Sequence, residues 1–209
     1  MRRSYSEREL VLPDSPIVAF KEWLKEAAQL PSIVEPNAMV LSTLGEDDFI
    51  STRTVLLKDV SDDGFTFFTN YNSRKANAIN INPQVTLLFP WYAMERQVIV
   101  QGFAAKVSQE ESDAYFQTRP YKSKIGAWAS QQSAPLASRA ELEERYKGAA
   151  AKWPDEVPTP PHWGGYLVKP FSIEFWQGRT SRLHDRIRFE RSHNSGEITS
   201  NWEAKRYYP

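Results

Sequence analysis

Residues 85–107 read VTLLFPWYAMERQVIVQGFAAKV, and this stretch decides the fold class. Its two halves, 85–89 and 96–107, are rich in β-branched and aromatic residues, which favour strands. The connection between them is shorter than the roughly one dozen residues that a parallel crossover requires. The stretch therefore predicts two strands that pair antiparallel, and it argues against a βαβ unit.

Similar strand-like runs occur along most of the chain, and turns that carry Gly, Asp or Asn separate most of them. These runs cover residues 38–43, 50–57, 65–69, 165–168, 172–177, 186–191 and 199–207. Because strands near both ends of the chain can complete one sheet, we expect a single domain. The expected class is mainly β with peripheral helices (α+β), built around a barrel-like sheet.

Helices are expected beside these strands. The sequence DSP at 14–16 predicts a helix that begins at residue 16 and ends before Pro31, since proline is favoured in a first turn. Two capping boxes, SQEE at 108–111 and SRAE at 138–141, predict helices that end near residues 118 and 152. Shorter helices are expected at 73–80 and within 122–133.

The composition excludes several classes of protein. The 209 residues contain 26 Lys and Arg against 26 Asp and Glu, which argues against a dedicated nucleic-acid binder. The chain has no Cys, so disulfides, thiolate metal sites and cysteine nucleophiles are excluded. No apolar run approaches the roughly 20 residues of a membrane span, and the charged first ten residues do not resemble a secretory signal. We therefore expect a cytoplasmic protein with no membrane or nucleic-acid partner.

Common catalytic motifs are missing as well. The three histidines, His162, His184 and His193, form no close pair and have no carboxylate cluster beside them, so no metal site is expected. The sequence lacks the GxSxG, GxGxxG and Walker A patterns. If the protein is an enzyme, an organic cofactor is expected to carry the difficult chemistry.

Arg74 and Lys75 follow Ser73 at an expected helix start, where the helix dipole is positive. Two cations at this end are locally unfavourable unless an anion such as a phosphate accepts hydrogen bonds from the backbone N–H groups and from both side chains. Two interpretations fit the pattern. One is a phosphate site, and the other is a pair of solvated surface cations whose small cost is tolerated.

Residues 182–186 read RLHDR. In an extended segment Arg182, His184 and Arg186 share one face, and they repel unless a negative or electron-rich group lies over them. Asp185 points to the other face and cannot neutralise them directly. The alternative is a basic edge strand that discourages pairing with another chain, and the argument from parity fails if a loop replaces the strand.

Two more groups are candidates for anion binding. Arg53 and Lys58 lie at the ends of an expected strand that contains no acidic partner, although both side chains can also extend into water. Tyr115 and Arg119 share a helix face, and Ser123 follows closely, so these three residues are candidates for a second phosphate site. Alternatively, Arg119 only stabilises the negative end of the helix.

Taken in order, short motifs resemble the pyridoxamine 5′-phosphate oxidase family over nearly the whole chain. They are RTVLLK at 53–58, NSRK at 72–75, LFPW at 88–91, ERQ at 95–97, SKIGAW at 123–128, QS at 132–133, WGG at 163–165, EFWQG at 174–178 and RLHDR at 182–186. Each motif alone is modestly specific, whereas all of them in this order are highly specific.

The resemblance implies an FMN-binding split β-barrel and a homodimer with two FMN sites at the subunit interface. It also implies a reaction, in which pyridoxamine 5′-phosphate or pyridoxine 5′-phosphate is oxidised to pyridoxal 5′-phosphate. Dioxygen then reoxidises the flavin and is reduced to hydrogen peroxide. Two alternatives remain: a split-barrel flavin reductase that uses another substrate, and a non-enzymatic protein that binds FMN or pyridoxal phosphate.

The resemblance also implies roles for individual residues. FMN contacts are expected from Arg53, Thr54, Val55, Leu56, Leu57, Lys58, Phe68, Thr69, Arg74, Lys75, Gln97, Gln132, Ser133, Trp176 and Arg186. Substrate contacts are expected from Lys58, Tyr115, Arg119, Ser123, Arg182, Leu183, His184, Arg2, Arg3 and Tyr5. Arg182 and His184 form the expected catalytic pair, which orients the 4′ substituent and helps its proton leave. Residues 1–15 are expected to form a flexible cover for the substrate, and residues 16–209 the FMN-binding domain.

Overall fold

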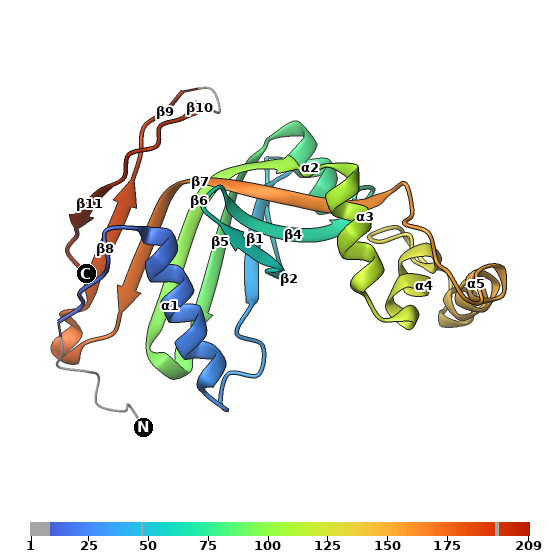
Figure 1. The fold of residues 1–209 in the computed structure, drawn as a ribbon, viewed down its shortest axis with the longest axis horizontal. Helices are drawn as coiled ribbons and strands as arrows, with labels where there is room; N and C mark the ends of the chain where they lie inside the picture. The colour runs from blue at the N-terminus through green and yellow to red at the C-terminus, as the bar shows by residue number, and fades with distance from the viewer. Residues whose placement is uncertain (1–8, 47, 195–196) are drawn as a thin grey trace.

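A curled β-sheet forms the centre of the molecule in the computed structural model, which describes residues 9–46, 48–194 and 197–209. Its strands run in the order β11-β8-β7-β6-β5-β1-β2, and β4 pairs with both β7 and β3 (Figure 1). The strands are β1 (Ala38–Leu44), β2 (Ile50–Leu56), β3 (Asp59–Ser61), β4 (Gly64–Asn70), β5 (Gln84–Trp91), β6 (Arg96–Lys106), β7 (Trp163–Gln177), β8 (Asp185–Glu190) and β11 (Glu203–Arg206). A separate short hairpin contains β9 (His193–Asn194) and β10 (Glu197–Ile198).

Five helices accompany this sheet in the described part of the chain, and a serine cap precedes each of them except α4, which begins at Tyr121 directly after Pro120. They are α1 (Pro16–Gln29), α2 (Arg74–Ile81), α3 (Gln109–Thr118), α4 (Tyr121–Ala129) and α5 (Arg139–Lys152), with short 3-10 turns η1 (Tyr92–Met94) and η2 (Thr180–Arg182). The side chains of Ser15, Ser73, Ser108 and Ser138 each accept a hydrogen bond from a backbone N–H of the following turn. Within the described residues, no helix has both the length and the apolar character that crossing a membrane requires.

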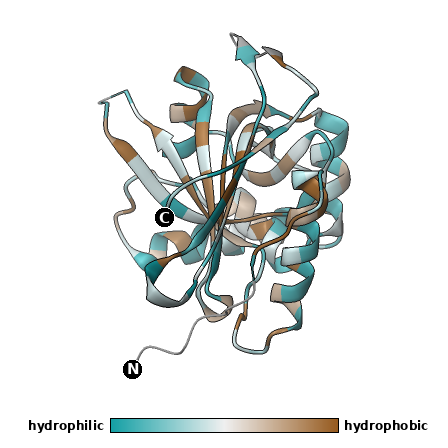
Figure 2. Ribbon diagram, turned by 90° about the vertical axis from the view of Figure 1, so that its left-hand side faces the viewer, coloured by the Kyte–Doolittle hydropathy of each residue, from teal (hydrophilic) through white to brown (hydrophobic). Residues whose placement is uncertain are grey.

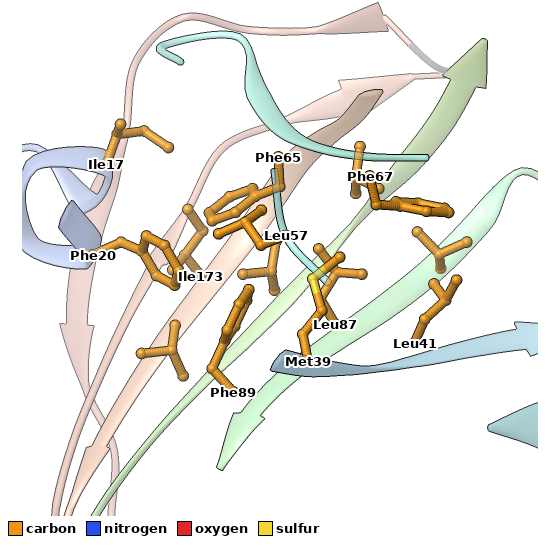
Figure 3. Close-up of a cluster of buried hydrophobic side chains, with 14 of the residues drawn as sticks. Ile17, Phe20, Met39, Leu41, Leu57, Phe65, Phe67, Leu87, Phe89 and Ile173 are labelled. Carbon is orange, nitrogen blue, oxygen red and sulfur yellow. The ribbon is translucent and has the colours of Figure 1, made fainter. Parts of the chain in front are cut away.

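The core lies between α1 and the concave face of the sheet (Figure 3). Phe20 of α1 is fully buried and meets Phe65 and Phe89 edge-on, at ring-centroid distances of 4.9 and 4.7 Å. On β1, Met39 and Leu41 are buried while their neighbours are partly exposed, as the period of two in a strand requires. Figure 2 shows the resulting mixture of hydrophobic and hydrophilic residues along strands and helices. The expected mainly β domain with peripheral helices is confirmed.

The C-terminal strands differ from the expectation at two places. Segments 165–168 and 172–177 are one strand, β7, because Pro170 is accommodated where the register with β6 shifts beside Gly102. A proline has no N–H for the ladder, so a bulge is where a long strand tolerates it. Residues 199–207 form only the short strand β11, which pairs with β8. The pairing of β5 with β6 is antiparallel, as residues 85–107 predict.

We predict that Gly102→Ala destabilises the fold and that Gly148→Ala does not. A Cβ at residue 102 would lie 2.4 Å from the Lys169 carbonyl oxygen, which is backbone and cannot turn away. Overpacking of this kind costs about 1–3 kcal/mol. At residue 148, in α5, a Cβ meets nothing within 4 Å, and alanine favours a helix by roughly 0.5–1 kcal/mol.

Urea unfolding of both variants in the same ligand state measures the two changes. Equal unfolding free energies for Gly102→Ala and Gly148→Ala would contradict this account of the bulge.

Candidate functional site

A cavity of about 1070 Å³ opens between β2, β4 and the helices α2, α3 and α4. Residues from five separate elements therefore share one space. Two of these elements, α3 and α4, lie at one end of the molecule in Figure 1. The lining residues are Ser51, Thr52, Arg53, Thr54, Val55, Leu56, Lys58, Phe68, Thr69, Asn70, Arg74, Lys75, Tyr115, Thr118, Arg119, Pro120, Ser123, Gly126, Ala127, Ser130, Gln132, Ser133 and Trp163.

One end of this cavity is a cluster of cations, namely Arg53, Arg74 and Lys75. Arg53 points from β2 toward β1, where its Nη1 donates to the Leu41 carbonyl at 3.0 Å and to Thr43 Oγ1 at 2.9 Å. Arg74 and Lys75 form the first turn of α2. The helix therefore adds its own positive end to a group of like charges. Such an arrangement is costly by itself and becomes favourable when an anion enters.

The Lys75 ammonium lies deep in this cluster, with 9% of the residue exposed. It donates to Gln132 Oε1 at 2.9 Å and to Thr69 Oγ1 at 3.0 Å, neither of which carries a charge. Burial, with a further contribution from the Arg53 charge, lowers the pKa of Lys75 to about 8. Burial and the Arg74 charge lower the pKa of Arg53 as well. Arg53 and Lys75 thus place partly buried positive charge beside uncharged partners.

Another group of lining residues, which we call the aromatic wall, contains Phe68, Tyr115 and Trp163 together with the cation Arg119. Phe68 stacks on Tyr115, with ring centroids 4.0 Å apart, and also on Trp163 at 5.3 Å. The Arg119 guanidinium lies 4.8 Å from the Trp163 ring, and its buried Nη1 has no hydrogen-bond partner among the described residues. Burial lowers the pKa of Arg119. A buried guanidinium nitrogen without an acceptor indicates a ligand that supplies one.

A second group of predicted residues lies outside this cavity, on β6, β7 and β8. Gln97, Trp176 and Arg186 are register partners, so their side chains share one face of the sheet. The His184 ring lies 4.7 Å from the Trp176 ring. We call Gln97, Trp176, Arg182, His184 and Arg186 the β7–β8 row. In Figure 1 the β7–β8 connection lies at the end of the molecule away from α3 and α4.

Arg186 is held by a buried carboxylate. Its Nε and Nη2 donate to the two oxygens of Glu174 at 2.9 and 3.1 Å, and Arg188 Nε donates to the same carboxylate at 2.8 Å. Burial alone raises the pKa of Glu174, but the hydrogen bonds and charges of both arginines outweigh it and hold this pKa below its ordinary value. Glu174 was not among the expected site residues, although it begins the EFWQG motif.

Of the two alternatives for residues 182–186, the structure shows the one in which a turn replaces the strand, so alternation does not place Arg182, His184 and Arg186 on one face. Strand β8 begins only at Asp185, and Arg182 belongs to the turn η2. Ser181 and Arg182 both have left-handed backbones, with φ of 58° and 62°. Consecutive left-handed residues other than glycine cost roughly 1–2 kcal/mol each. The pattern of alternation cannot show such a turn, because the residue types of the RLHDR segment are compatible with a strand.

Fourteen of the expected contact residues line the cavity. They are Arg53, Thr54, Val55, Leu56, Lys58, Phe68, Thr69, Arg74, Lys75, Tyr115, Arg119, Ser123, Gln132 and Ser133.

Leu57 was expected to contact FMN but does not line the cavity, because its side chain is buried in the hydrophobic core. The expected FMN contacts Gln97, Trp176 and Arg186 and the expected substrate contacts Arg182, Leu183 and His184 do not line the cavity. Arg2, Arg3 and Tyr5 lie outside the described residues. Within one chain, the expected site residues thus form two separate groups, namely the cavity residues and the β7–β8 row.

Several functional neighbours were missed by the sequence reasoning. Thr43 orients Arg53, while Asn70, Ser130 and Trp163 line the cavity from three different segments. A threonine within an apolar strand gives no signal of this role, because its partner lies ten residues away in the next strand. Trp163, which begins the WGG motif, is part of both the cavity wall and a hydrophobic cluster.

Comparison with known proteins decides the family. Residues 24–152 match the model described as "Pyridoxamine 5′-phosphate oxidase", and residues 163–209 match "Pyridoxine 5′-phosphate oxidase C-terminal dimerisation region". The chain belongs to the pyridoxamine 5′-phosphate oxidase family. It is 49% identical to the pyridoxine/pyridoxamine 5′-phosphate oxidase of Burkholderia cenocepacia, over 100% of this chain and 97% of that one. The relative of the same name from Thermosynechococcus vestitus shows the same identity and coverage.

Solved structures of this family share the fold. PhzG from Burkholderia lata, determined with tetrahydrophenazine-1-carboxylic acid, superposes with a TM-score of 0.86 at 29% identity, over 94% of each chain. A related FMN-binding protein from Nostoc punctiforme gives 0.73 at 17% identity, over 93% of this chain and 98% of that one, and so supports the fold alone. The split-barrel architecture expected from the sequence is confirmed.

We predict that the wild-type protein gains unfolding free energy relative to a Lys75→Met variant as the pH rises from about 8 to 10.5. The pKa of Lys75 is about 8 in the folded chain against an ordinary 10.5, so the unfolded chain binds more protons across this window. Unfolding free energy therefore rises with pH, and below the window the full cost of the buried charge is present. The gain has an upper limit of about 3 kcal/mol, since water in the cavity screens the charge.

Urea unfolding of both ligand-free proteins at several pH values measures this difference. Parallel pH profiles for the wild type and for Lys75→Met would show that the buried ammonium is not the group responsible.

Proposed function

We propose that this protein is an FMN-dependent oxidase that converts pyridoxamine 5′-phosphate and pyridoxine 5′-phosphate to pyridoxal 5′-phosphate. The cofactor and the substrate each carry a phosphate, and the cavity holds two separate cationic regions. The observation that carries the proposal is the buried Arg119 Nη1, which has no acceptor among the described residues while the cation cluster lies in the same cavity. The identity of 49–50% with oxidases of this name supports it.

The cation cluster fits the FMN phosphate. Arg53, Arg74 and Lys75 share the cavity with the N-terminus of α2. Arg53 and Lys75 donate hydrogen bonds to uncharged oxygens. A phosphate dianion would offset the burial and the repulsion that together lower the pKa of Arg53 and of Lys75. Gln132, which accepts from Lys75, would keep that ammonium directed at the phosphate.

The aromatic wall fits the second phosphate. Arg119, Tyr115 and Ser123 line the cavity together, and Lys58 joins them from the end of β2. Arg119 lies against Trp163 and Phe116, so little water can replace a missing acceptor there. A substrate phosphate would supply that acceptor and fix the position of the ring to which it is attached. A non-phosphorylated substrate would leave the guanidinium unsatisfied.

The complete site is proposed to form between two copies of the chain. The cavity and the β7–β8 row lie apart on one chain, whereas the expected chemistry requires both groups around the same ligands. The outer sheet face between them carries half-buried apolar side chains, including Val40, Leu88 and Ile99, which are register partners on β1, β5 and β6. Residues 163–209, which contain β7 and β8, match a region described as a dimerisation region.

When bound, FMN would supply the acceptor for a hydride equivalent from the substrate C4′ carbon and would pass the electrons to dioxygen, giving hydrogen peroxide. The protein's contribution is to bind and to orient. Two phosphate anchors would fix both ring systems, and alignment of this kind can contribute about 7–11 kcal/mol. Arg182 and His184 of the partner chain would lie over the substrate, and Gln97, Trp176 and Arg186 would contact the flavin.

We predict that two inactive variants restore each other. Arg119→Ala removes the substrate phosphate contact from the cavity, and Arg182→Ala removes a group of the β7–β8 row. In a mixed dimer one site receives its cavity from the Arg182→Ala chain and its row from the Arg119→Ala chain, so that site is intact. Random pairing then restores about one quarter of wild-type oxidase activity after co-refolding, because half of all dimers are mixed and each has one good site.

A matched control uses the double variant Arg119→Ala/Arg182→Ala with the wild type. Its mixed dimers contain no intact site, so only the wild-type homodimers are active. These make up about one quarter of all dimers after random pairing of equal amounts, so the activity is about one quarter of that of the same total amount of wild-type protein. No activity in the first mixture and about one half of wild-type activity in the second, with all proteins folded, would place the complete site within one chain.

We further predict that the purified protein is yellow and that its flavin absorbance bleaches when pyridoxamine 5′-phosphate is added without oxygen. Readmission of air should return the colour and release hydrogen peroxide. A flavin reductase would bleach with a nicotinamide donor but not with this amine, and a binding protein would bleach with neither. Retained colour in the presence of the amine would therefore reject the proposed function.

A further inference from the structure

We propose that the main-chain amide of Arg179 holds His184 as the tautomer with its proton on Nε2, so that His184 is a hydrogen-bond donor to the substrate and not a proton acceptor. This inference rests on the proposed function for its substrate. It concerns the connection between β7 and β8, residues 178–184, where the structure records a contact that the sequence does not suggest. Arg179 acts through His184 and is therefore a positioning residue.

The inference rests on one hydrogen bond, in which the donor and the acceptor are unambiguous. The backbone N–H of Arg179 donates to His184 Nδ1 at 3.0 Å. A backbone N–H can only donate, so Nδ1 must present its lone pair and cannot carry a hydrogen. A neutral imidazole then has its hydrogen on Nε2. In that form Nε2 offers an N–H and has no lone pair with which to accept a proton from a ligand.

The surroundings keep this geometry in place. Arg179 Nη1 donates to Asp185 Oδ2 at 3.1 Å, and the Leu10 N–H donates to the same oxygen at 3.1 Å. The Asp185 side chain is thus fixed directly after His184, and Arg206 Nη1 contacts its other oxygen at 3.2 Å. The residues on both sides of the amide–imidazole contact are therefore tied to the body of the fold.

The imidazole ring is restrained as well. Its plane is tilted by 47° to the Trp176 ring, with centroids 4.7 Å apart, so rotation of the ring would disturb a contact with β7. The Leu183 N–H donates to the Thr180 carbonyl at 3.1 Å and closes the turn that carries the strained Ser181. A half-turn flip of the ring would place the Cδ2 carbon against the Arg179 amide and would lose the hydrogen bond to Nδ1.

The chemical consequence is that His184 acts as a hydrogen-bond donor and does not act as a general base. A substrate of the pyridoxyl class has oxygen or nitrogen lone pairs beside its reacting C4′ carbon, and an Nε2–H would donate to one of them. One hydrogen bond contributes about 0.5–1.5 kcal/mol, whereas a general base contributes about 10²–10⁴ in rate. The two roles therefore predict different sizes of effect when the ring is removed.

Nitrogen NMR of ¹⁵N-histidine-labelled holoenzyme tests the tautomer directly. The chain has three histidines, so the spectrum is simple, and His184→Gln identifies the signal of residue 184 by its loss. We expect, at neutral pH, a pyridine-type signal for Nδ1 and a pyrrole-type signal for Nε2. A protonated Nδ1, in either the other neutral tautomer or the imidazolium, would overturn the proposal.

Two variants of Arg179 separate its amide from its side chain. Arg179→Ala keeps the N–H and should keep the His184 tautomer, whereas Arg179→Pro removes the N–H and should lose the preference for Nε2–H. Loss of the tautomer in Arg179→Ala would overturn the assignment to the amide. Because Arg179 has a φ of −134°, which proline does not adopt, the proline variant is a supporting measurement and the labelled wild type decides the question.

Substitution of His184 tests the donor role in turnover. His184→Ala should lower kcat/KM about tenfold, as loss of one hydrogen bond predicts, and His184→Gln, whose amide N–H lies near the position of Nε2, should recover most of it. A loss of 10²–10⁴ in both variants would indicate a base and overturn the proposal. The NMR measurement does not require turnover, so it reports the tautomer even if the protein has no oxidase activity. Absence of oxidase activity would reject the proposed function and not the tautomer.

Discussion

The antiparallel ladder between β6 and β7 is the constraint on which the rest of the structure depends. It runs from Arg96 opposite Gln177 to Lys106 opposite Tyr166, and it ties the centre of the chain to its C-terminal part. One end of β7 leads to the β7–β8 row, and the other end, at Trp163, reaches the wall of the cavity. Because a strand extends about 3.3 Å per residue, this one ladder sets the separation of the two groups of site residues.

The cavity illustrates how a binding site is costly before its ligand arrives. Arg53, Lys75 and Arg119 are each partly desolvated, and the pKa of each is lowered. The fold accepts this cost because the apolar core on the concave side of the sheet is large and well packed around Phe20, Phe65 and Phe89. Ligands with phosphate groups would convert the repulsion into binding energy, which is the basis of the proposed function.

In the connection between β7 and β8, a costly backbone conformation is likewise tolerated because the surrounding fold stabilises it. Two left-handed residues, Ser181 and Arg182, are held within a segment that the Asp185 carboxylate ties to Leu10, Arg179 and Arg206. Strain of this kind persists only where surrounding contacts fix the conformation. Those contacts also direct the Arg179 amide at His184, so the strained turn and the proposed tautomer have one structural origin.

The sequence by itself determined the mainly β class, the helix starts and the composition of the cavity. Alternating residues predict β1 and β5, serine caps mark α1 and α3, and the RTVLLK and NSRK motifs contain cavity residues, because these signals depend on neighbours close in the chain. Only the tertiary structure decided that Thr43 aims Arg53, that β7 is continuous through Pro170, and that the RLHDR segment begins in a strained turn. These features depend on strand register and on contacts between distant segments, which local residue patterns do not encode.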